Sequence, residues 1–259
     1  MNVTHLLETA AEAARAVGPR LRDAFRSRPQ VRAKSDFHDP VTEHDRAAEE
    51  TIRAVIASRA PGAIVGEEGG TTGSGDLTWY VDPIDGTANF AAGLPFFCVS
   101  IAAAAGGEVL AGVVYDPVRG DEFTATTGGA WCNGVPIRSA GAVRDREAML
   151  LTSYPGPHDL ALEGEEALRG FGRLVESFAS VRRTGSAALQ LAHVAAGWSD
   201  VTYGTGVSPW DVAAGALLVR QAGGVYLGDP LAPGGYLAHV GGFDLAASSL
   251  AGAAPPAGR

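Results

Sequence analysis

Cysteine and lysine are scarce in this chain of 259 residues. Two cysteines, Cys98 and Cys132, are too few for a disulfide-stabilised scaffold. Cys98 lies in an apolar run, so we expect it to be a buried thiol of the core. Lys34 is the one lysine among 20 lysines and arginines. Its place at the start of an acidic loop leaves two interpretations open: compositional drift, or a role for a compact ammonium that arginine cannot replace.

Long apolar runs and an excess of basic charge are also absent. The longest largely apolar run, 96–105, is too short to span a bilayer. The first 14 residues hold Glu8 and Glu12 and neither Lys nor Arg, which does not suit a signal peptide, so we expect the chain to stay in the cytoplasm. The net charge of −9 disfavours nucleic acid and anionic membranes as partners. The same charge would repel a phosphate ligand unless cations intervened.

The composition is otherwise that of an ordinary globular protein, with 46% apolar and 19% charged residues. Apolar residues at helical spacing predict helices over 3–25 and 43–59, and Gly18-Pro19 should kink or divide the first of them. Short strands are expected at 63–65 and 78–81. Residues 96–126 favour three strands of an antiparallel sheet, because a Gly-Gly turn and a bend separate apolar segments.

The second half of the chain alternates strands with helices. The expected strands are 149–152, 181–183 and 200–203, and the expected helices are 163–178, 186–196 and 210–222. Together with the first half, this order predicts layers of helices and sheets, an α+β architecture, with a division near residues 140–150.

The segment Trp79–Thr87 concentrates oxygen ligands in a few residues. A predicted strand ends at Asp82, and Pro83 constrains the backbone so that Asp85 can return to the same point. The main-chain carbonyl of Ile84 adds a third oxygen. This set is typical of a site for a hard cation such as Mg²⁺.

The end of this segment favours a phosphate next to the cation. Gly86 permits close approach of the backbone, and Thr87 can begin a helix whose free N–H groups favour an anion. A plain turn, which uses Asp and Gly only for geometry, is the competing interpretation. The complete strand-bounded string makes that interpretation the weaker one.

Three further acids lie where ordinary structural roles compete with a ligand role. Glu67 follows the predicted strand at 63–65 and could be a solvated surface acid. Asp211 opens a helix, where Asp is an ordinary capping residue. Asp45 also lies at a helix start, where an acid favours the helix dipole. The six histidines and two cysteines show no zinc-ligand spacing, and His193, on an apolar helix, is expected in the core.

These motifs together resemble the inositol monophosphatase family, within the wider fructose-bisphosphatase-like group. Four segments carry the resemblance: Asp82–Thr87 followed by Asn89-Phe90, Trp131–Gly134, Gly185–Ala188, and Trp210–Gly215. The resemblance extends from the first helix to about Gly224. Several motifs in the right order are more specific than any one of them, so they raise each acid above its ordinary structural role.

The resemblance implies a layered α-β-α-β-α sandwich and a site with two or three Mg²⁺ ions. It implies that Glu67, Asp82 and the Ile84 carbonyl hold one magnesium, and that Asp82, Asp85 and Asp211 hold a second. Four carboxylates and two divalent cations then balance in charge, so a phosphate can enter. Without the metals, the crowded like charges should raise at least one carboxylate pKa.

By the same resemblance, Thr87 paired with Asp45 orients the attacking water, Glu67 belongs to the catalytic set, and no covalent phosphoenzyme forms. The residues implied at the substrate are Gly86, Thr87, Gly185, Ala187, Asp211 and Lys34, the last on a loop that closes over the metals. A homodimer acting on a small phosphorylated metabolite is implied as well. The half 1–145 would carry most metal ligands, and 146–259 would complete the site of one compact unit.

Two departures from the family pattern bear on the substrate. Inositol-preferring members carry a carboxylate seven residues before the second-motif aspartate, where this chain has Gly204. The last helix is interrupted by Gly241-Gly242 and Pro255-Pro256. We predict a magnesium-dependent phosphomonoesterase, with inositol monophosphate as the first substrate. Histidinol phosphate, fructose 1,6-bisphosphate and a nucleotide 3′-phosphate are alternatives of the same chemistry, and a non-catalytic phosphate- or metal-binding regulator is the alternative of another class.

Overall fold

The computed structural model describes residues 1–33 and 40–253, so Lys34 and the Pro255-Pro256 tail lie outside the described residues. The α-helices of this part are α1 (Val3–Ala24), α2 (Glu43–Arg59), α3 (Thr87–Ala92), α4 (Pro157–Glu163), α5 (Glu165–Ser177), α6 (Ala187–Ala195) and α7 (Pro209–Gln221). There are also two short 3-10 helices, η1 (Asp145–Glu147) and η2 (Leu245–Ala247). None of the helices in the described ranges combines the length and apolar character needed to cross a membrane.

The first half of the chain builds an eight-stranded sheet. Its strands are β3 (Ala63–Gly66), β4 (Gly70–Thr72), β5 (Thr78–Asp85), β6 (Cys98–Ala105), β7 (Glu108–Asp116), β8 (Asp121–Thr126), β9 (Gly129–Cys132) and β10 (Val135–Pro136), in the spatial order β10-β9-β8-β7-β6-β5-β3-β4. β3 and β5 are parallel, and the other neighbours are antiparallel. The antiparallel strands predicted within 96–126 are confirmed as β6, β7 and β8.

The second half builds a five-stranded sheet. Its strands are β11 (Met149–Thr152), β12 (Ser180–Arg183), β13 (Val201–Val207), β14 (Val225–Leu227) and β15 (Gly234–His239), in the order β12-β11-β13-β15-β14. β11 is parallel to β12 and β13, whereas β15 is antiparallel to β13 and β14. The sequence signals predicted β11 to β13 but missed β14, β15 and α4, because the Gly and Pro residues beside these short elements are typical of loops.

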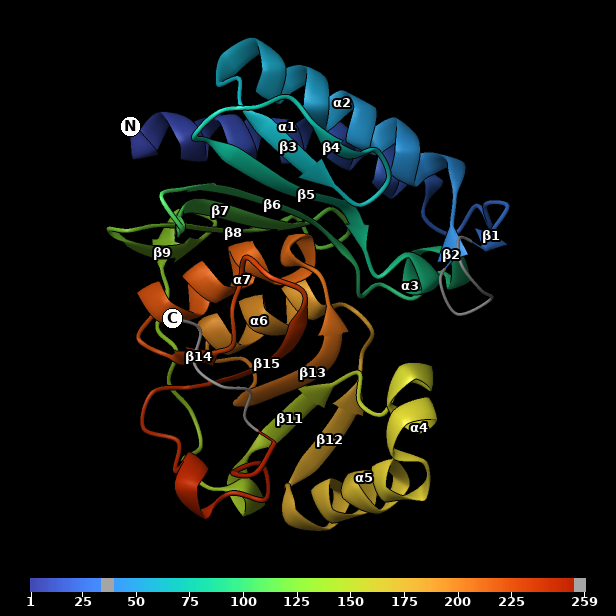
Figure 1. The fold of residues 1–259 in the computed structure, drawn as a ribbon, viewed down its shortest axis with the longest axis vertical. Helices are drawn as coiled ribbons and strands as arrows, with labels where there is room; N and C mark the ends of the chain where they lie inside the picture. The colour runs from blue at the N-terminus through green and yellow to red at the C-terminus, as the bar shows by residue number, and fades with distance from the viewer. Residues whose placement is uncertain (34–39, 254–259) are drawn as a thin grey trace.

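Figure 1 shows how the two sheets and the helices stack. α1 and α2 cover the outer face of the eight-stranded sheet, α6 and α7 lie between the sheets, and α4 and α5 cover the far side of the five-stranded sheet. The predicted α-β-α-β-α sandwich is confirmed. A separate two-stranded ribbon, β1 (Arg32–Ala33) and β2 (Pro40–Val41), lies next to α3. That the halves 1–145 and 146–259 act as one compact unit stays a prediction.

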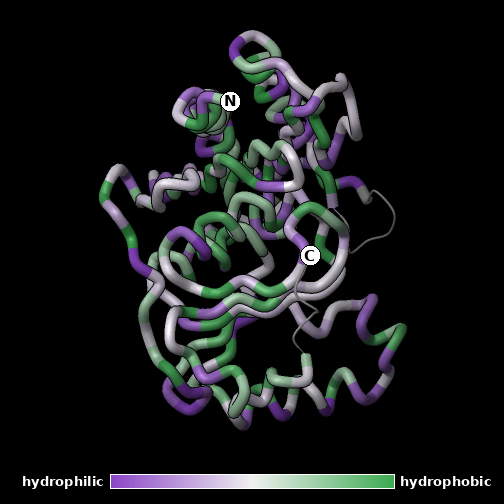
Figure 2. The backbone as a smooth tube through the Cα atoms, turned by 60° about the vertical axis from the view of Figure 1, so that its left-hand side comes forward, coloured by the Kyte–Doolittle hydropathy of each residue, from purple (hydrophilic) through white to green (hydrophobic). Residues whose placement is uncertain are grey.

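Helix α1 is continuous, so a division at Gly18-Pro19 is wrong, whereas a kink there stays a prediction. Tertiary packing explains the difference: α1 lies along β7, and a Cβ on Gly18 would stand 2.6 Å from Cε1 of Tyr115. Glycine therefore serves close approach of the helix to the sheet, and contacts along α1 offset the hydrogen bond that Pro19 cannot make. The outer helices alternate hydrophilic and hydrophobic residues along their length (Figure 2), which fits packing on one face only.

Both faces of the eight-stranded sheet are buried, one under α1 and α2 and the other on α6 and α7. This double cover explains the almost continuous apolar sequence of β6, where Cys98 is fully buried as expected. His193 of α6 packs against the rings of Phe96, Phe123 and Trp198, with centroids 5.4, 6.3 and 5.2 Å away. Burial lowers the pKa of His193 to about 4, which is typical of a neutral core histidine.

Candidate active site

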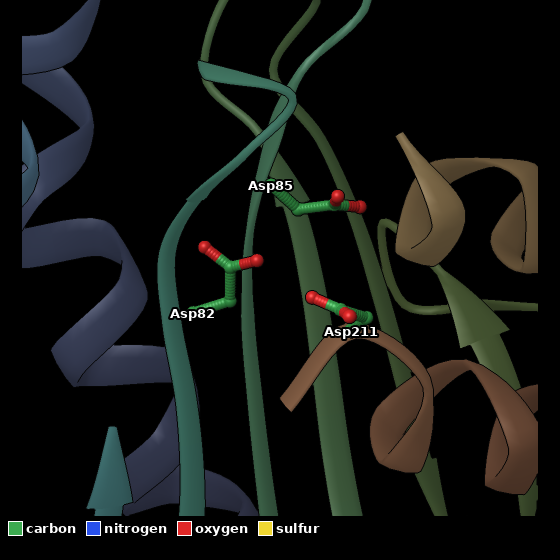
Figure 3. A group of neighbouring side chains, drawn as sticks. All are labelled: Asp82, Asp85 and Asp211. Atoms are coloured by element: carbon green, nitrogen blue, oxygen red, sulfur yellow. The ribbon is translucent and has the colours of Figure 1, made fainter. Parts of the chain in front are cut away.

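Strand β5 ends in the acidic motif, and a bulge decides where its two aspartates point. Asp82 pairs with Ser100 of β6 and Asp85 pairs with Cys98, so β5 holds an extra residue between the two pairs. Residues three apart in a regular strand face opposite sides of the sheet, and an inserted residue turns both to the same side. Pro83 lies in this bulge, where proline is tolerated. Both carboxylates therefore point into one space, 2% and 8% exposed (Figure 3).

The third aspartate of the site lies in the first turn of α7. Asp211 Oδ2 accepts a hydrogen bond from the backbone N–H of Ser208 at 2.7 Å, as a capping residue does. The carbonyl of Trp210 accepts a hydrogen bond from the Ser100 hydroxyl at 2.9 Å, which ties this turn to β6. Asp211 thus caps its helix and also lies beside the aspartates of β5.

The three aspartates form an acidic cluster that can bind a metal ion. One carboxylate oxygen from each of Asp82, Asp85 and Asp211 lies within 4.8 Å of the others. Figure 3 shows these side chains turned toward one another from β5 and from the start of α7. Among the residues that the structure describes, this is the one such group of three or more His, Cys, Asp or Glu side chains. Its ligand atoms are all carboxylate oxygens, which suit a hard cation.

The pKa values of the cluster show the cost of crowding these carboxylates. Burial raises the pKa of Asp82 well above its usual range, and repulsion from Glu67, Asp85 and Asp211 raises it further. Burial raises the pKa of Asp85 to about 6, even though hydrogen bonds to its carboxylate oppose the shift. Burial, with repulsion from Asp85, raises the pKa of Asp211 to about 8. A bound divalent cation would compensate these charges, so the donor set fits a metal.

Glu67 reaches the cluster because β3 runs parallel to β5. Gly66 pairs with Val81, and the N–H of Glu67 donates to the Val81 carbonyl at 3.2 Å. Glu67 and Asp82, the next residues on the two strands, therefore lie side by side. The Glu67 carboxylate is close enough to raise the pKa of Asp82. Such a half-buried position does not suit a solvated surface acid.

Asp85 is held at the N-terminus of α6 as well as in the cluster. Its Oδ2 accepts hydrogen bonds from the Ser186 hydroxyl and the Ala188 N–H, both at 2.6 Å, and its Oδ1 accepts one from the Ala187 N–H at 3.3 Å. Ala187 therefore meets the site through its backbone. This contact connects the eight-stranded sheet to the helix layer in the middle of the molecule and fixes the Asp85 carboxylate.

Asp45 and Thr87 are in contact, although they are 42 residues apart in the chain. Thr87 Oγ1 lies 2.9 Å from Asp45 Oδ1 and 3.0 Å from the carbonyl oxygen of Ile84. Asp45 Oδ2 accepts hydrogen bonds from the N–H and the hydroxyl of Thr42 at 2.8 and 2.6 Å. Asp45 therefore caps α2 with one oxygen and reaches Thr87 with the other, so helix α2 does fold back over the site.

Two glycines let the backbone approach closely at this point. Gly86 has φ 97° and Gly185 has φ 78°, values that glycine adopts readily. A Cβ on Gly86 would lie 3.0 Å from the carbonyl oxygen of Phe96. Both glycines line a pocket of about 190 Å³, whose lining residues are Pro40, Glu67, Asp82, Ile84, Asp85, Gly86, Thr87, Ala88, Gly185 and Asp211. The predicted substrate residue Lys34 lies outside the described residues.

Gly204, the predicted gap in the substrate site, has a packing role. It lies on β13 opposite Tyr236 of β15, and a Cβ at Gly204 would stand 2.5 Å from Cε1 of the tyrosine. Tyr236 is 1% exposed, and its hydroxyl lies 3.2 Å from Gln190 Oε1 and 3.3 Å from Thr202 Oγ1. A side chain at position 204 and the ring of Tyr236 therefore exclude each other.

Comparison with known proteins assigns this arrangement to a family. The model of the inositol monophosphatase family matches residues 2–256. The chain belongs to the inositol monophosphatase family. Nus factor SuhB of Pseudomonas aeruginosa is 45% identical to it over 230 residues, which cover 85% of this chain and 84% of the relative. Nus factor SuhB of Escherichia coli (strain K12) is 41% identical over 226 residues, with the same coverage of 85% and 84%.

Solved structures of two similar proteins share the fold. The inositol monophosphatase from Anabaena (Nostoc) sp. PCC 7120 gives a TM-score of 0.81 at 34% identity, with 93% of each chain covered. The IMPase of Thermotoga maritima also gives 0.81, at 33% identity, with 91% of this chain and 92% of the other covered. The fold of the inositol monophosphatase family therefore extends over nearly the whole chain.

Two residues of this family member were not singled out from the sequence, although one holds an aspartate of the site and the other lies on the same helix as Asp45. Ser186 holds Asp85, and its position just before α6 is a helix-capping signal that could have identified it. Glu49 is 2% exposed and lies on α2, four residues after Asp45. That spacing places both acids on one face of the helix. Which residues this face contacts depends on how α2 packs in the fold, which the sequence does not reveal.

Proposed function

We propose that the chain is a magnesium-dependent phosphomonoesterase that hydrolyses a small phosphate monoester. The observation that carries this proposal is the convergence of Asp82, Asp85 and Asp211, with raised pKa values, beside a threonine hydroxyl held by Asp45. Oxygen-only donors at this spacing favour Mg²⁺ over a softer metal. The same pocket contains the glycines that let a phosphate approach the backbone.

The metal ligands in this proposal are Glu67, Asp82, Asp85 and Asp211 together with the Ile84 carbonyl. Their four carboxylates match the charge of two Mg²⁺ ions, and we propose two or three ions per site. When bound, magnesium lowers the pKa of a water molecule and offsets charge on the phosphate. Charge balance also explains how a chain of net charge −9 accepts an anionic substrate.

Thr87 and Asp45 position the attacking water in this proposal. The Thr87 hydroxyl donates a hydrogen bond to Asp45 Oδ1 or to the Ile84 carbonyl, so a lone pair of its Oγ1 can accept a hydrogen bond from water. The water oxygen forms a bond to phosphorus while the ester P–O bond breaks. The water gives up a proton, the leaving alcohol oxygen takes one, and the products are an alcohol and inorganic phosphate.

Inositol monophosphate is the first substrate we propose, and histidinol phosphate, fructose 1,6-bisphosphate and a nucleotide 3′-phosphate are the alternatives. The Anabaena relative that is named an inositol monophosphatase supports the first choice. Gly204 argues for a different leaving group, because it removes a carboxylate that would accept hydrogen bonds from ring hydroxyls. Gly86, Thr87, Gly185, Ala187 and Asp211 are the proposed contacts of the substrate within the described residues, with Lys34 beyond them.

Release of phosphate from this substrate panel, with and without Mg²⁺, tests the function. We expect turnover with Mg²⁺ and none in excess chelator. Asp82→Asn keeps an acceptor for the Ile84 N–H, 2.9 Å from Asp82 Oδ1 in the wild type, but removes a charge from the cluster. We expect this variant to stay folded and lose turnover. Activity that persists in chelator, or full activity of Asp82→Asn, would refute the metal mechanism.

A second function is favoured by the names of the relatives, several of which are called Nus factor SuhB. The chain could act as a regulator that binds phosphate or metal without turnover. The Thr87–Asp45 contact argues for catalysis, because binding alone does not need an oriented hydroxyl. A purified wild-type chain that binds Mg²⁺ but releases no phosphate from any member of the panel would favour the regulator.

A homodimer and a location in the cytoplasm also belong to the proposal. Resemblance to the inositol monophosphatase family implies the homodimer, and the location in the cytoplasm is the expectation drawn from the sequence. Light scattering coupled to size-exclusion chromatography measures the mass directly. We expect about twice the mass of 26.5 kDa of one chain.

A further inference from the structure

One face of helix α2 carries three charged residues at successive turns: Asp45, Glu49 and Arg53. Residues four apart on a helix lie on the same face, so all three face the same neighbours. Asp45 reaches Thr87, as described above. Glu49 is 2% exposed, and the side chain of Arg53 is 17% exposed. Neither Glu49 nor Arg53 lines the pocket that holds the acidic cluster.

Glu49 holds the turn that leads from β3 to β4. Its Oε2 accepts a hydrogen bond from the N–H of Glu68 at 2.7 Å, and its Oε1 accepts one from the N–H of Gly69 at 2.8 Å. The Nε of Arg53 donates to the same Oε1 at 2.7 Å. Both carboxylate oxygens are therefore bound, and the charge of Glu49 is balanced inside the fold.

Arg53 binds the next residues of the chain, which belong to β4. Its Nη2 donates to the carbonyl of Gly70 at 2.7 Å, and its Nη1 donates to Thr72 Oγ1 at 2.6 Å. The planar guanidinium thus connects Glu49 to two points of the turn at once, a geometry that lysine cannot reproduce. We call this pair of residues the Glu49–Arg53 clamp.

The turn is shaped to admit the clamp. A Cβ on Gly66 would lie 2.5 Å from Glu49 Oε1, and a Cβ on Gly69 would lie 2.7 Å from the same atom. Neither glycine is in the left-handed region, so close approach of the carboxylate, and not backbone conformation, is the reason for glycine at both positions. The backbone on either side of Glu67 is thus built to receive Glu49.

We propose that the Glu49–Arg53 clamp is a positioning device for Glu67 in the metal site. This inference rests on the proposed function, in which Glu67 is a metal ligand. Glu67 stands between Gly66, which packs on the Glu49 carboxylate, and Glu68, whose N–H the carboxylate binds. One helix then fixes both Thr87, through Asp45, and Glu67, through Glu49. A metal ligand needs its position held within about 0.5 Å, which a rigid helix provides.

Stability alone is a poor explanation of this clamp. The buried carboxylate of Glu49 and the half-buried guanidinium of Arg53 lose hydration that their attraction offsets only in part, and apolar residues often stabilise a buried position as well or better. Charged hydrogen bonds to backbone N–H groups instead give a defined geometry. Partners of metal ligands commonly affect metal affinity or activity by about 10–100-fold.

Glu49→Gln tests the proposal, because glutamine keeps the size but has one acceptor oxygen and adds an amide donor. We expect the Mg²⁺ concentration for half-maximal activity to rise about 10–100-fold. We expect KM for the phosphate ester at saturating Mg²⁺ to change by less than about threefold, since Glu49 lies outside the pocket. Glu50→Gln is the matched control, an exposed neighbour on the same helix, and its Mg²⁺ dependence should equal that of the wild type.

A double variant shows whether the clamp acts through Glu67. Glu67→Gln should raise the Mg²⁺ requirement by itself, and adding Glu49→Gln should then raise it by less than about twofold. A purely structural role predicts another result. Either Glu49→Gln lowers the melting temperature and leaves the Mg²⁺ concentration for half-maximal activity unchanged, or the rise in Mg²⁺ requirement of the double variant equals the product of the rises in the two single variants. Either of these outcomes overturns the proposal.

Metal binding measured without turnover separates this inference from the proposed function. Mn²⁺ titrated into the folded protein and followed by electron paramagnetic resonance should bind Glu49→Gln about 10–100-fold more weakly than the wild type. If the wild type releases no phosphate but shows this difference, the clamp stands and the phosphatase proposal fails. If the wild type is active and both Mn²⁺ affinity and Mg²⁺ dependence of Glu49→Gln are unchanged, the clamp proposal fails. Arg53→Lys should give an intermediate loss in both measurements.

Discussion

At the scale of single residues, the Thr87 hydroxyl is a group with two neighbours that compete for one proton. The hydroxyl can donate its hydrogen bond either to Asp45 Oδ1 at 2.9 Å or to the Ile84 carbonyl at 3.0 Å, and in both cases Thr87 Oγ1 can still accept a hydrogen bond. The hydroxyl is therefore oriented before any water arrives. Orientation of this kind costs nothing at the moment of reaction, which is why it can contribute to rate.

Replacing Thr87 tests this orientation. Thr87→Val keeps the shape of the side chain but removes the hydroxyl. We expect kcat to fall about 10²–10⁴-fold, the range typical of groups that take part in proton transfer in the transition state, because the attacking water is no longer oriented. The Mg²⁺ concentration for half-maximal activity should stay within about threefold, because no carboxylate is lost. Thr87→Ser restores the hydroxyl and should recover most of kcat. Steady-state assays at saturating Mg²⁺ measure all three; a Val variant with wild-type kcat would remove Thr87 from the mechanism.

Gly204 gives the second prediction at this scale. Gly204→Glu alone should destabilise the fold, by ~1–3 kcal/mol, because its Cβ would overlap the ring of Tyr236. Gly204→Glu combined with Tyr236→Ala should relieve the overlap and raise kcat/KM for inositol monophosphate relative to the other members of the panel. Tyr236→Ala alone is the control for the cavity it creates. Chemical denaturation and relative rates are the measurements, and equal rate ratios in the control and double variants would contradict the substrate argument.

At the scale of elements, the turn between β3 and β4 illustrates why a glycine can matter without a special backbone conformation. Gly66 pairs with Gly70 across the two strands, and it faces the Glu49 carboxylate. A methyl group there would displace either the carboxylate or the strand. Since β3 also sets the register that brings Glu67 beside Asp82, a shift in this element reaches the acidic cluster.

Gly66→Ala therefore should reduce activity although the substitution is small. We expect the Mg²⁺ requirement to rise at least about tenfold, because the added Cβ would lie 2.5 Å from Glu49 Oε1. Gly172→Ala is the matched control: it lies inside α5, where a Cβ meets no atom within 4 Å, and should be neutral or slightly stabilising. Activity against Mg²⁺ concentration compares the two. Equal curves for both variants would show that the turn tolerates the methyl group.

At the scale of the whole molecule, the cluster joins layers that lie far apart in sequence. Asp82 and Asp85 come from the eight-stranded sheet, and Asp211 comes from α7 between the sheets. Repulsion among these carboxylates therefore opposes the packing of one layer on another. A metal ion that binds all three relieves this repulsion, so metal binding and folding are coupled.

The sign of this coupling follows from the pKa values. Asp85 and Asp211 have folded-state pKa values of about 6 and about 8, above the value near 3.9 of an exposed Asp. The folded state then binds more protons than the unfolded state between about pH 4 and pH 8, so the stability of the metal-free protein falls as pH rises through this range. Mg²⁺ binds the ionised carboxylates and should reverse the loss at pH 8.

We expect the metal-free protein to melt several degrees higher at pH 5.5 than at pH 8, and Mg²⁺ to raise the melting temperature more at pH 8. Asp82→Asn should stabilise the metal-free protein at pH 8 by ~1–3 kcal/mol and reduce the gain from Mg²⁺. Calorimetry or circular dichroism with chelator or Mg²⁺ measures these shifts. A metal-free protein that is as stable at pH 8 as at pH 5.5, with no gain in Asp82→Asn, would contradict this account of the cluster.

Short-range signals in the sequence determined much of this protein. The acidic string at Asp82–Thr87, the caps of α2 and α7, and the apolar spacing of α1 and α2 depend on residues within one or two turns, so they could be read without a structure. The motifs in their order also indicated the family, which the comparisons confirm. Where local signals conflicted with packing, as at Gly18-Pro19, the prediction of a divided helix was wrong.

Tertiary structure alone decided how the site is assembled. The spacing of Asp45 and Glu49 shows that they share a helix face, but only docking of α2 brings that face to Thr87 and to the turn with Glu67. The same holds for the Tyr236 ring beside Gly204. The physical reason is that periodicity reports which side of an element is buried, whereas its contacts depend on strand pairing and helix docking between segments far apart in the chain.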